Sequence, residues 1–147
     1  MFSIPADYLD VSLKILTSAF LGGLIGLERE SNGKDAGVRT YSLVCLGSAL
    51  VMIVSFGITK GQAGADPSRI AAQVVSGIGF LGAGAILRSE KGSIKGLTTA
   101  AGIWTAAGIG LACGLGMYYA AMFATGFTLF ILVVFSRVDR LLGGKDY

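Results

Sequence analysis

The stretch Leu97–Phe135, LTTAAGIWTAAGIGLACGLGMYYAAMFATGFTLFILVVF, contains 39 residues and no charged side chain. A helix needs about 20 predominantly apolar residues to cross the hydrocarbon core of a bilayer. The stretch would form roughly 58 Å of helix, about twice that thickness, so we expect it to fold back on itself. The glycines of GLGM, residues 114–117, permit the reversal. The sequence therefore predicts two membrane helices, near 97–113 and 117–135.

The rest of the chain has the same membrane character. Hydrophobic residues make up 53% of its 147 residues and charged residues only 14%, whereas soluble domains carry about 25% charged residues. Three further runs are long and apolar enough to cross a bilayer: Val11–Leu27, in which only Lys14 is charged, Tyr41–Thr59 and Ile70–Leu87. We therefore predict an all-α polytopic membrane protein, one transmembrane domain over residues 1–147 with about five transmembrane helices.

Lysine and arginine are distributed unequally between the two ends of these helices. Segments 28–40, 88–96 and 136–147 hold nine of the twelve basic residues, and the other three lie toward the opposite end. Because basic residues are enriched on the cytoplasmic side of membranes, we predict an outside N-terminus and a cytoplasmic C-terminus. The basic residues form no run, so the net charge of +3 does not indicate nucleic-acid binding.

A second stretch, GIGFLGAGAIL at residues 77–87, contains the spacing G-x-G-x-x-G of a dinucleotide-binding turn. Such a turn needs a strand before it and an acidic residue about 20 positions after it, whereas these glycines lie inside an uncharged apolar run. We therefore interpret them as small residues that let neighbouring membrane helices approach closely.

Small residues recur at helical spacing in three of the predicted helices. Because those of the third helix (70–87) lie on two faces, we expect this helix to be the central one, in tight contact with the first and fourth. The same small residues could instead pack against a second copy of the chain in a homodimer. The predicted packing residues are Gly22 and Gly26, then Ala72, Gly77, Gly79, Ala83 and Gly84, then Gly102 and Gly110.

Charged side chains cluster at the predicted cytoplasmic ends of the first three helices. Anchoring at the interface together with mutual ion pairing explains such a cluster. The alternative is a cytoplasmic polar site for a divalent cation or a partner loop. Glu28 and Glu30 are two positions apart and point in different directions on a helix, so they cannot clamp a metal ion without a third element. The cluster consists of Glu28, Arg29, Glu30, Arg39 and Arg88.

Polar residues also surround the beginning of the third helix, on the side predicted to be outside. Asp66 is expected to cap this helix, with Pro67 at its first position, and Arg69 to pair with Asp66 or with a lipid phosphate. Gln73 and Ser76 are expected to be buried. There they either lock two helices together by hydrogen bonds or line a polar cavity.

Several kinds of chemistry lack the residues that they need. The chain has no histidine and shows no pairing of a nucleophile with a base, so we expect neither an enzyme nor a bound cofactor. No Asp, Glu or Arg lies inside a predicted span, although ion-coupled transporters usually need one. Transport is therefore disfavoured, although backbone carbonyls at the glycines could still form a solute site.

Four motifs carry a family resemblance: GGLIGLERE (22–30), AGVRTYSLVCLGSAL (36–50), DPSRIAAQVVSGIGFLGAGAIL (66–87) and KGLTTAAGIWTAAGIG (95–110). In this order they resemble the MgtC/SapB family of bacterial inner-membrane proteins. The resemblance implies a link to growth at low magnesium and, in some pathogens, to survival inside host phagocytes. It also implies a modulator that binds other membrane proteins, including the F-type ATP synthase. Many members continue into a soluble C-terminal domain, whereas this chain is similar to the short, membrane-only members.

Two functions follow as hypotheses. The first is a small membrane regulator in the bacterial cytoplasmic membrane, whose cytoplasmic charge cluster contacts a partner or holds the bundle shut. The second is a transporter or channel for Mg²⁺ or another small solute, which would use Asp66, Arg69, Gln73 and Ser76.

Overall fold

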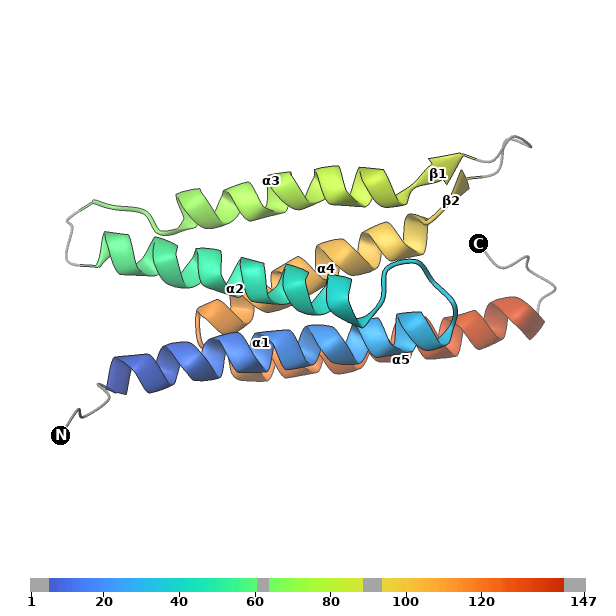
Figure 1. Ribbon diagram of the computed structural model, residues 1–147, viewed down its shortest axis with the longest axis horizontal. Coiled ribbons are helices and arrows are strands. Elements are labelled where there is room, and N and C mark those ends of the chain that lie inside the picture. The colour runs from blue at the N-terminus through green and yellow to red at the C-terminus, as the bar shows by residue number, and fades with distance from the viewer. Residues whose placement is uncertain (1–5, 61–63, 89–93, 142–147) are drawn as a thin grey trace.

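The computed structural model describes residues 6–60, 64–88 and 94–141. Within these ranges, five α-helices run side by side and alternate in direction (Figure 1). They are α1 (Ala6–Ser31), α2 (Val38–Thr59), α3 (Ser68–Ala85), α4 (Leu97–Gly114) and α5 (Tyr118–Leu141). The predicted all-helical fold is therefore confirmed. The sequence did not predict the antiparallel pair of two-residue strands, β1 (Leu87–Arg88) and β2 (Ile94–Lys95), that connects α3 with α4.

Four of the helices, α1, α2, α4 and α5, are long and apolar enough to cross a membrane. Helix α3 carries Arg69, Gln73 and Ser76 among its apolar residues, and it lies antiparallel beside α2 and α4 (Figure 1). Large apolar side chains such as Phe80 and Tyr119 are exposed on the outer surface of the bundle. A soluble monomer rarely exposes so much apolar surface, so the chain has the architecture of a helical membrane protein.

The alternation of directions brings the most basic segments to one end of the bundle, here called the basic end. The loop 32–37, the two strands and the C-terminal end of α5 lie at the basic end, and α1 begins at the opposite one (Figure 1). This grouping agrees with the alternation predicted from the sequence. That the basic end faces the cytoplasm stays a prediction.

The reversal between α4 and α5 lies where the sequence predicts it. Gly116 has φ of +78°, in the left-handed region that glycine adopts without steric cost. The N–H of Gly116 donates to the carbonyl of Cys113, and the N–H of Met117 donates to the carbonyl of Ala112, both at 2.9 Å. This Schellman arrangement satisfies the last carbonyls of α4 and ends the helix.

Helix α4, and not α3, occupies the centre of the bundle. It packs against α1, α2, α3 and α5, whereas α3 packs mainly against α4 and α2. On α3, burial is confined to Ala71, Ile78 and Gly82. The prediction that the glycine-rich third helix is central is therefore wrong, because only one face of it meets the bundle.

Two glycines of α1 bring its backbone against α2. A Cβ atom at Gly22 would lie 2.5 Å from the carbonyl oxygen of Tyr41, and one at Gly26 would lie 2.6 Å from the Cα of Val38. Both distances are shorter than real Cβ atoms tolerate. These positions therefore accept only glycine unless the helices move apart.

Two glycines of α4 bring its backbone against the same buried face of α2, at Tyr41 and Cys45. A Cβ at Gly110 would collide with the backbone carbonyl of Cys45, and one at Gly102 would lie 2.5 Å from the hydroxyl of Tyr41. The buried Cys45 thiol also donates to the carbonyl of Ala106 at 3.0 Å. The tight core thus consists of α1, α2 and α4, instead of the first, third and fourth helices.

The small residues expected to pack α3 lie on its outer surface. At its three exposed glycines, no neighbouring helix lies within 4 Å of an added Cβ. The contact with α4 runs through Gly82, whose Cβ would lie 3.7 Å from that of Ala100. Small residues permit a close approach, but a neighbour must also lie on that face. The outward-facing residues are Ala72, Gly77, Gly79, Ala83 and Gly84.

Candidate functional site

The last turn of α1 carries a buried ion pair at the basic end. The Arg29 side chain is only 4% exposed. Its guanidinium donates from Nε to Oε2 of Glu28 at 2.6 Å and from Nη2 to Oε1 at 3.0 Å. A charge can be buried at moderate cost only when it is paired and hydrogen-bonded. This two-point contact therefore neutralises Arg29 within its own helix.

Two further contacts join this ion pair to the loop 32–37. The Asn32 amide donates to the Glu28 carboxylate at 2.9 Å and to the Glu28 carbonyl at 2.8 Å. Glu30 faces another way, and its Oε2 accepts the N–H of Val38 at 2.9 Å. That N–H belongs to the first turn of α2, which has no side-chain cap of its own at Gly37. Glu28 and Glu30 therefore have separate structural tasks.

The structure thus separates the charge cluster predicted from the sequence. Glu28, Arg29 and Glu30 hold the α1–α2 corner together, whereas Arg39 is exposed. Arg88 has its backbone in β1, and its side chain lies outside the described part of the structure. Of the cluster residues that the structure describes, Glu30 and Arg39 are exposed, and Arg39 is the one that no contact ties to the α1–α2 corner.

A hollow at the basic end brings together residues that the sequence analysis did not select. It has a volume of about 380 Å³ and lies between the loop 32–37, the end of α3 and the beginning of α4. Asp35 and Lys95 contribute opposite charges to its lining, and Thr40 and Thr99 contribute hydroxyl groups. These residues are far apart in the sequence, so no local pattern could have predicted their proximity.

At the opposite end, Asp66 caps α3 as expected. Its Oδ1 accepts the N–H of Ser68 at 2.8 Å. Hydrogen bonding by Ser68, first from its side chain and then from its backbone, lowers the pKa of the Asp66 carboxyl below its usual value. Because the pKa is lower in the folded chain, the cap is in place at neutral pH and is lost as the pH falls through that pKa. Asp66 is therefore a structural residue at physiological pH.

Gln73 and Ser76 are not buried, in contrast to the prediction. Both side chains are exposed on α3. Gln73 borders an open hollow of about 540 Å³ that Thr59, Asp66 and Arg69 also line. The buried face of α3 is the opposite one, so neither a lock between helices of this chain nor an enclosed cavity forms at Gln73.

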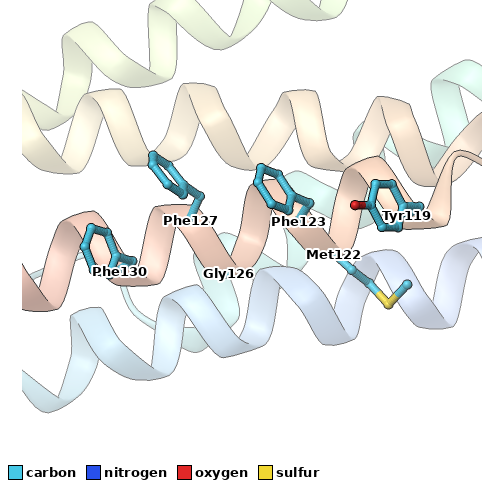
Figure 2. Close-up of a pocket in the computed structure, with 6 residues that line it drawn as sticks. All are labelled: Tyr119, Met122, Phe123, Gly126, Phe127 and Phe130. Atoms are coloured by element: carbon cyan, nitrogen blue, oxygen red, sulfur yellow. The ribbon is translucent and has the colours of Figure 1, made fainter.

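Helix α5 presents a row of aromatic rings on its exposed surface. Figure 2 shows Tyr119, Phe123, Phe127 and Phe130 along the helix, with Gly126 among them. Successive ring centroids are 6.3, 6.1 and 5.7 Å apart, the spacing of interacting aromatic pairs. The outer side of α5 from Tyr119 to Phe130 is therefore apolar, as expected for a helix that faces lipid.

Comparison with known proteins places the chain among membrane proteins. The model of the MgtC family matches residues 15–141. YhiD of Escherichia coli K12, whose name proposes that it transports magnesium, is 46% identical over 140 residues, which cover 92% of this chain and 65% of that protein. Protein SrpB of Synechococcus elongatus is 38% identical over 151 residues, which cover 96% of this chain and 83% of that protein.

A third relative, Protein MgtC of Salmonella typhimurium LT2, is 48% identical over 89 residues, which cover 60% of this chain and 36% of that protein. The chain thus spans less than two thirds of the length of YhiD and about a third of the length of Protein MgtC. The names of these three relatives do not describe enzymes. No solved structure matches the chain.

Proposed function

Because the chain belongs to the MgtC family of membrane proteins, we propose that it is a membrane-embedded regulator that binds other membrane proteins and does not itself carry a solute. We place it in the bacterial cytoplasmic membrane, with the basic end toward the cytoplasm. The family resemblance suggests growth at low magnesium as its setting. It also suggests the F-type ATP synthase as the first partner to test.

The filled centre of the bundle is the observation that supports this proposal most directly. Helices α2 and α4 meet there through backbone atoms at Gly110. Buried hydroxyls such as those of Ser48 and Thr125 bond to carbonyls of their own helix, Ser48 to Val44 at 2.7 Å and Thr125 to Ala121 at 2.8 Å. The Tyr41 hydroxyl donates across to the carbonyl of Thr99 on α4 at 3.3 Å, and among the described residues the Ser18 hydroxyl is buried without a partner. A solute path needs polar groups that are free to replace a hydration shell. A centre closed by backbone contact fits a binding scaffold better than a path.

The distribution of open polar groups supports the same proposal. The buried charge at the basic end is already paired, by Glu28 with Arg29. Arg39, Gln73 and Ser76 are exposed on the outer surface, where a second membrane protein could reach them. Polar side chains on the outer surface of a membrane helix are costly in lipid, so contact with another protein would be favourable.

Transport of Mg²⁺ or another small solute is the second candidate function. The hollow beside Asp66, Arg69 and Gln73 is the observation that favours it. Mg²⁺ is usually held by one or two carboxylates together with water and other oxygen ligands. Asp66 would be the ligand to examine first, although no cluster of three or more His, Cys, Asp or Glu side chains occurs within the described ranges.

A flux assay separates the two functions. Purified protein in liposomes that enclose a Mg²⁺-sensitive dye is expected to take up Mg²⁺ no faster than empty liposomes, because the centre of the bundle is packed. An ionophore added at the end serves as the positive control. Saturable uptake that Asp66→Asn or Gln73→Ala abolishes would reject the regulator proposal and establish transport.

A further inference from the structure

Helix α3 turns one face outward, and the ends of this face border two hollows that the chain itself forms. Ile70 and Gln73 line one hollow with Thr59 of α2, and Gly84 lines the other with Thr40 of α2. Phe80, the one aromatic residue of the helix, is 84% exposed. Gly77 and Gly84, one turn before and one turn after it, have no neighbouring helix within 4 Å of an added Cβ. Gln73 is exposed on the same face, and in the described part of the chain no group hydrogen-bonds to its amide.

The residues of this face follow the spacing of a helix-pairing seam. Ile70, Gln73, Gly77, Phe80 and Gly84 are separated alternately by three and four positions, the repeat that keeps one seam facing a partner helix. At about 100° per residue they fall within a sector of about 80°. The buried face of α3, which contains Gly82, is on the opposite side. The name α3 seam is used below for these five residues.

We propose that the α3 seam binds the α3 seam of a second copy of this chain, which gives a two-fold symmetric dimer in the membrane. Two copies inserted in the same orientation and related by a two-fold axis along the membrane normal bring their α3 helices together in parallel. The contacting face of each copy must then carry both a projecting side chain and a gap that receives the same side chain of the other copy. The proposal goes beyond the regulatory function and does not depend on it, since a transporter could form the same dimer.

The shape of the seam meets this requirement. In a parallel pair, each projecting side chain enters a hole formed by four residues of the facing helix. Phe80 of one copy is the projecting side chain. The hole that receives it on the second copy is open because Gly77 and Gly84 of that copy have no side chains to fill it. The alternation of one large residue with two glycines is therefore self-complementary.

The polar groups along α3 are complementary to their own copies as well. A two-fold axis at the seam places the two Gln73 amides opposite each other, where each can donate to and accept from the other. Asp66 and Arg69 are oppositely charged, line the same hollow, and form no ion pair with each other in the described chain. In the dimer, Arg69 of each copy can reach Asp66 of the other. The shape of the α3 seam, the pairing of the Gln73 amides and the charges of Asp66 and Arg69 thus all favour a second copy of this chain as the partner.

Disulfide cross-linking in native membrane vesicles tests the dimer. In a Cys45→Ala/Cys113→Ala background, Gly77→Cys is expected to form a disulfide-linked dimer on mild oxidation, at least five times faster than Gly108→Cys. Gly108 is the matched control, because it is also open to its surroundings but lies on α4. Equal rates for the two variants, or bridges from Gly77→Cys to other proteins only, would overturn the proposal.

A second measurement does not depend on cysteine chemistry. In mild detergent, native mass spectrometry is expected to show dimer that Gln73→Leu weakens about 3- to 20-fold, as loss of interhelical hydrogen bonds between membrane helices does. Ala83→Leu places the same apolar side chain on α3 outside the seam and is expected to leave the dimer unchanged. A wild-type chain that stays monomeric at all concentrations, or equal effects of the two substitutions, would contradict the assignment.

Discussion

Replacing Gly110 by alanine is expected to destabilise the bundle by about 3 kcal/mol, at the upper end of the usual cost of overpacking. The new methyl group would collide with the backbone carbonyl of Cys45. A backbone carbonyl cannot rotate away as a side chain can, so α2 and α4 would have to separate along their contact. The measurement is unfolding of the purified protein in mild detergent by added SDS, followed by circular dichroism.

Gly108→Ala is the matched control for this prediction. It lies on the same helix, two positions away, and an added Cβ meets nothing within 4 Å. Alanine is favoured over glycine inside a helix by about 0.5–1 kcal/mol, so Gly108→Ala is expected to be neutral or slightly stabilising. Equal unfolding midpoints for the two variants would show that α2 and α4 do not meet at Gly110.

Arg29→Ala is expected to destabilise the protein by about 3–5 kcal/mol, because it removes one partner of a buried ion pair and leaves Glu28 uncompensated. Arg39→Ala removes an exposed arginine from the neighbouring helix and is expected to change stability by less than about 0.5 kcal/mol. The same SDS unfolding experiment measures both variants.

A double variant distinguishes the ion pair from other effects of losing the Arg29 side chain. Glu28→Gln/Arg29→Met removes both charges and keeps most of the volume, so it is expected to recover at least half of the stability lost in Arg29→Ala. If Arg29→Ala is as mild as Arg39→Ala, the guanidinium is solvated and the buried pair does not exist.

The helices themselves could be predicted from the sequence because membrane spans depend on local composition. The uncharged run 97–135 had to reverse, and the glycines at 114–117 were the natural place for the turn. The dinucleotide-binding interpretation of residues 77–82 failed for the same local reason, and α3 is indeed one uninterrupted helix across them. Length, charge and glycine position were sufficient for these predictions.

Which helices pack against each other could not be predicted in the same way. Small residues on α3 show that a neighbour can come close, but not whether the neighbour belongs to the same chain. Helix α2 took the expected place of α3 in the core, and its own small residues, Cys45, Ser48 and Ala49, were the signal that was missed. Their spacing of three and four positions marks the buried face of that helix.

The sequence indicated that charged residues gather at the end of α1, but it did not indicate what each of these residues does. Charged residues at the end of a helix are usually anchors at the interface, and nothing in GLERE distinguishes a buried arginine from an exposed one. Arg29 lies beside the corner between α1 and α2, where Asn32 donates to the Glu28 carboxylate and Glu30 accepts the N–H of Val38 at the start of α2. The placement of Asp35 and Lys95 around one hollow likewise depends on the tertiary fold.

The most direct test of the account concerns which face of α3 meets the bundle. In the Cys45→Ala/Cys113→Ala background, Gly82→Cys/Ala100→Cys would place two Cβ atoms 3.7 Å apart, close to the usual 3.8 Å of a disulfide. Oxidation in native membranes is expected to join them within one chain, whereas Gly77→Cys/Ala100→Cys is expected to form no bridge within a chain. A bridge within one chain in the second variant and none in the first would show that the glycine face of α3 is turned inward, and would contradict the account.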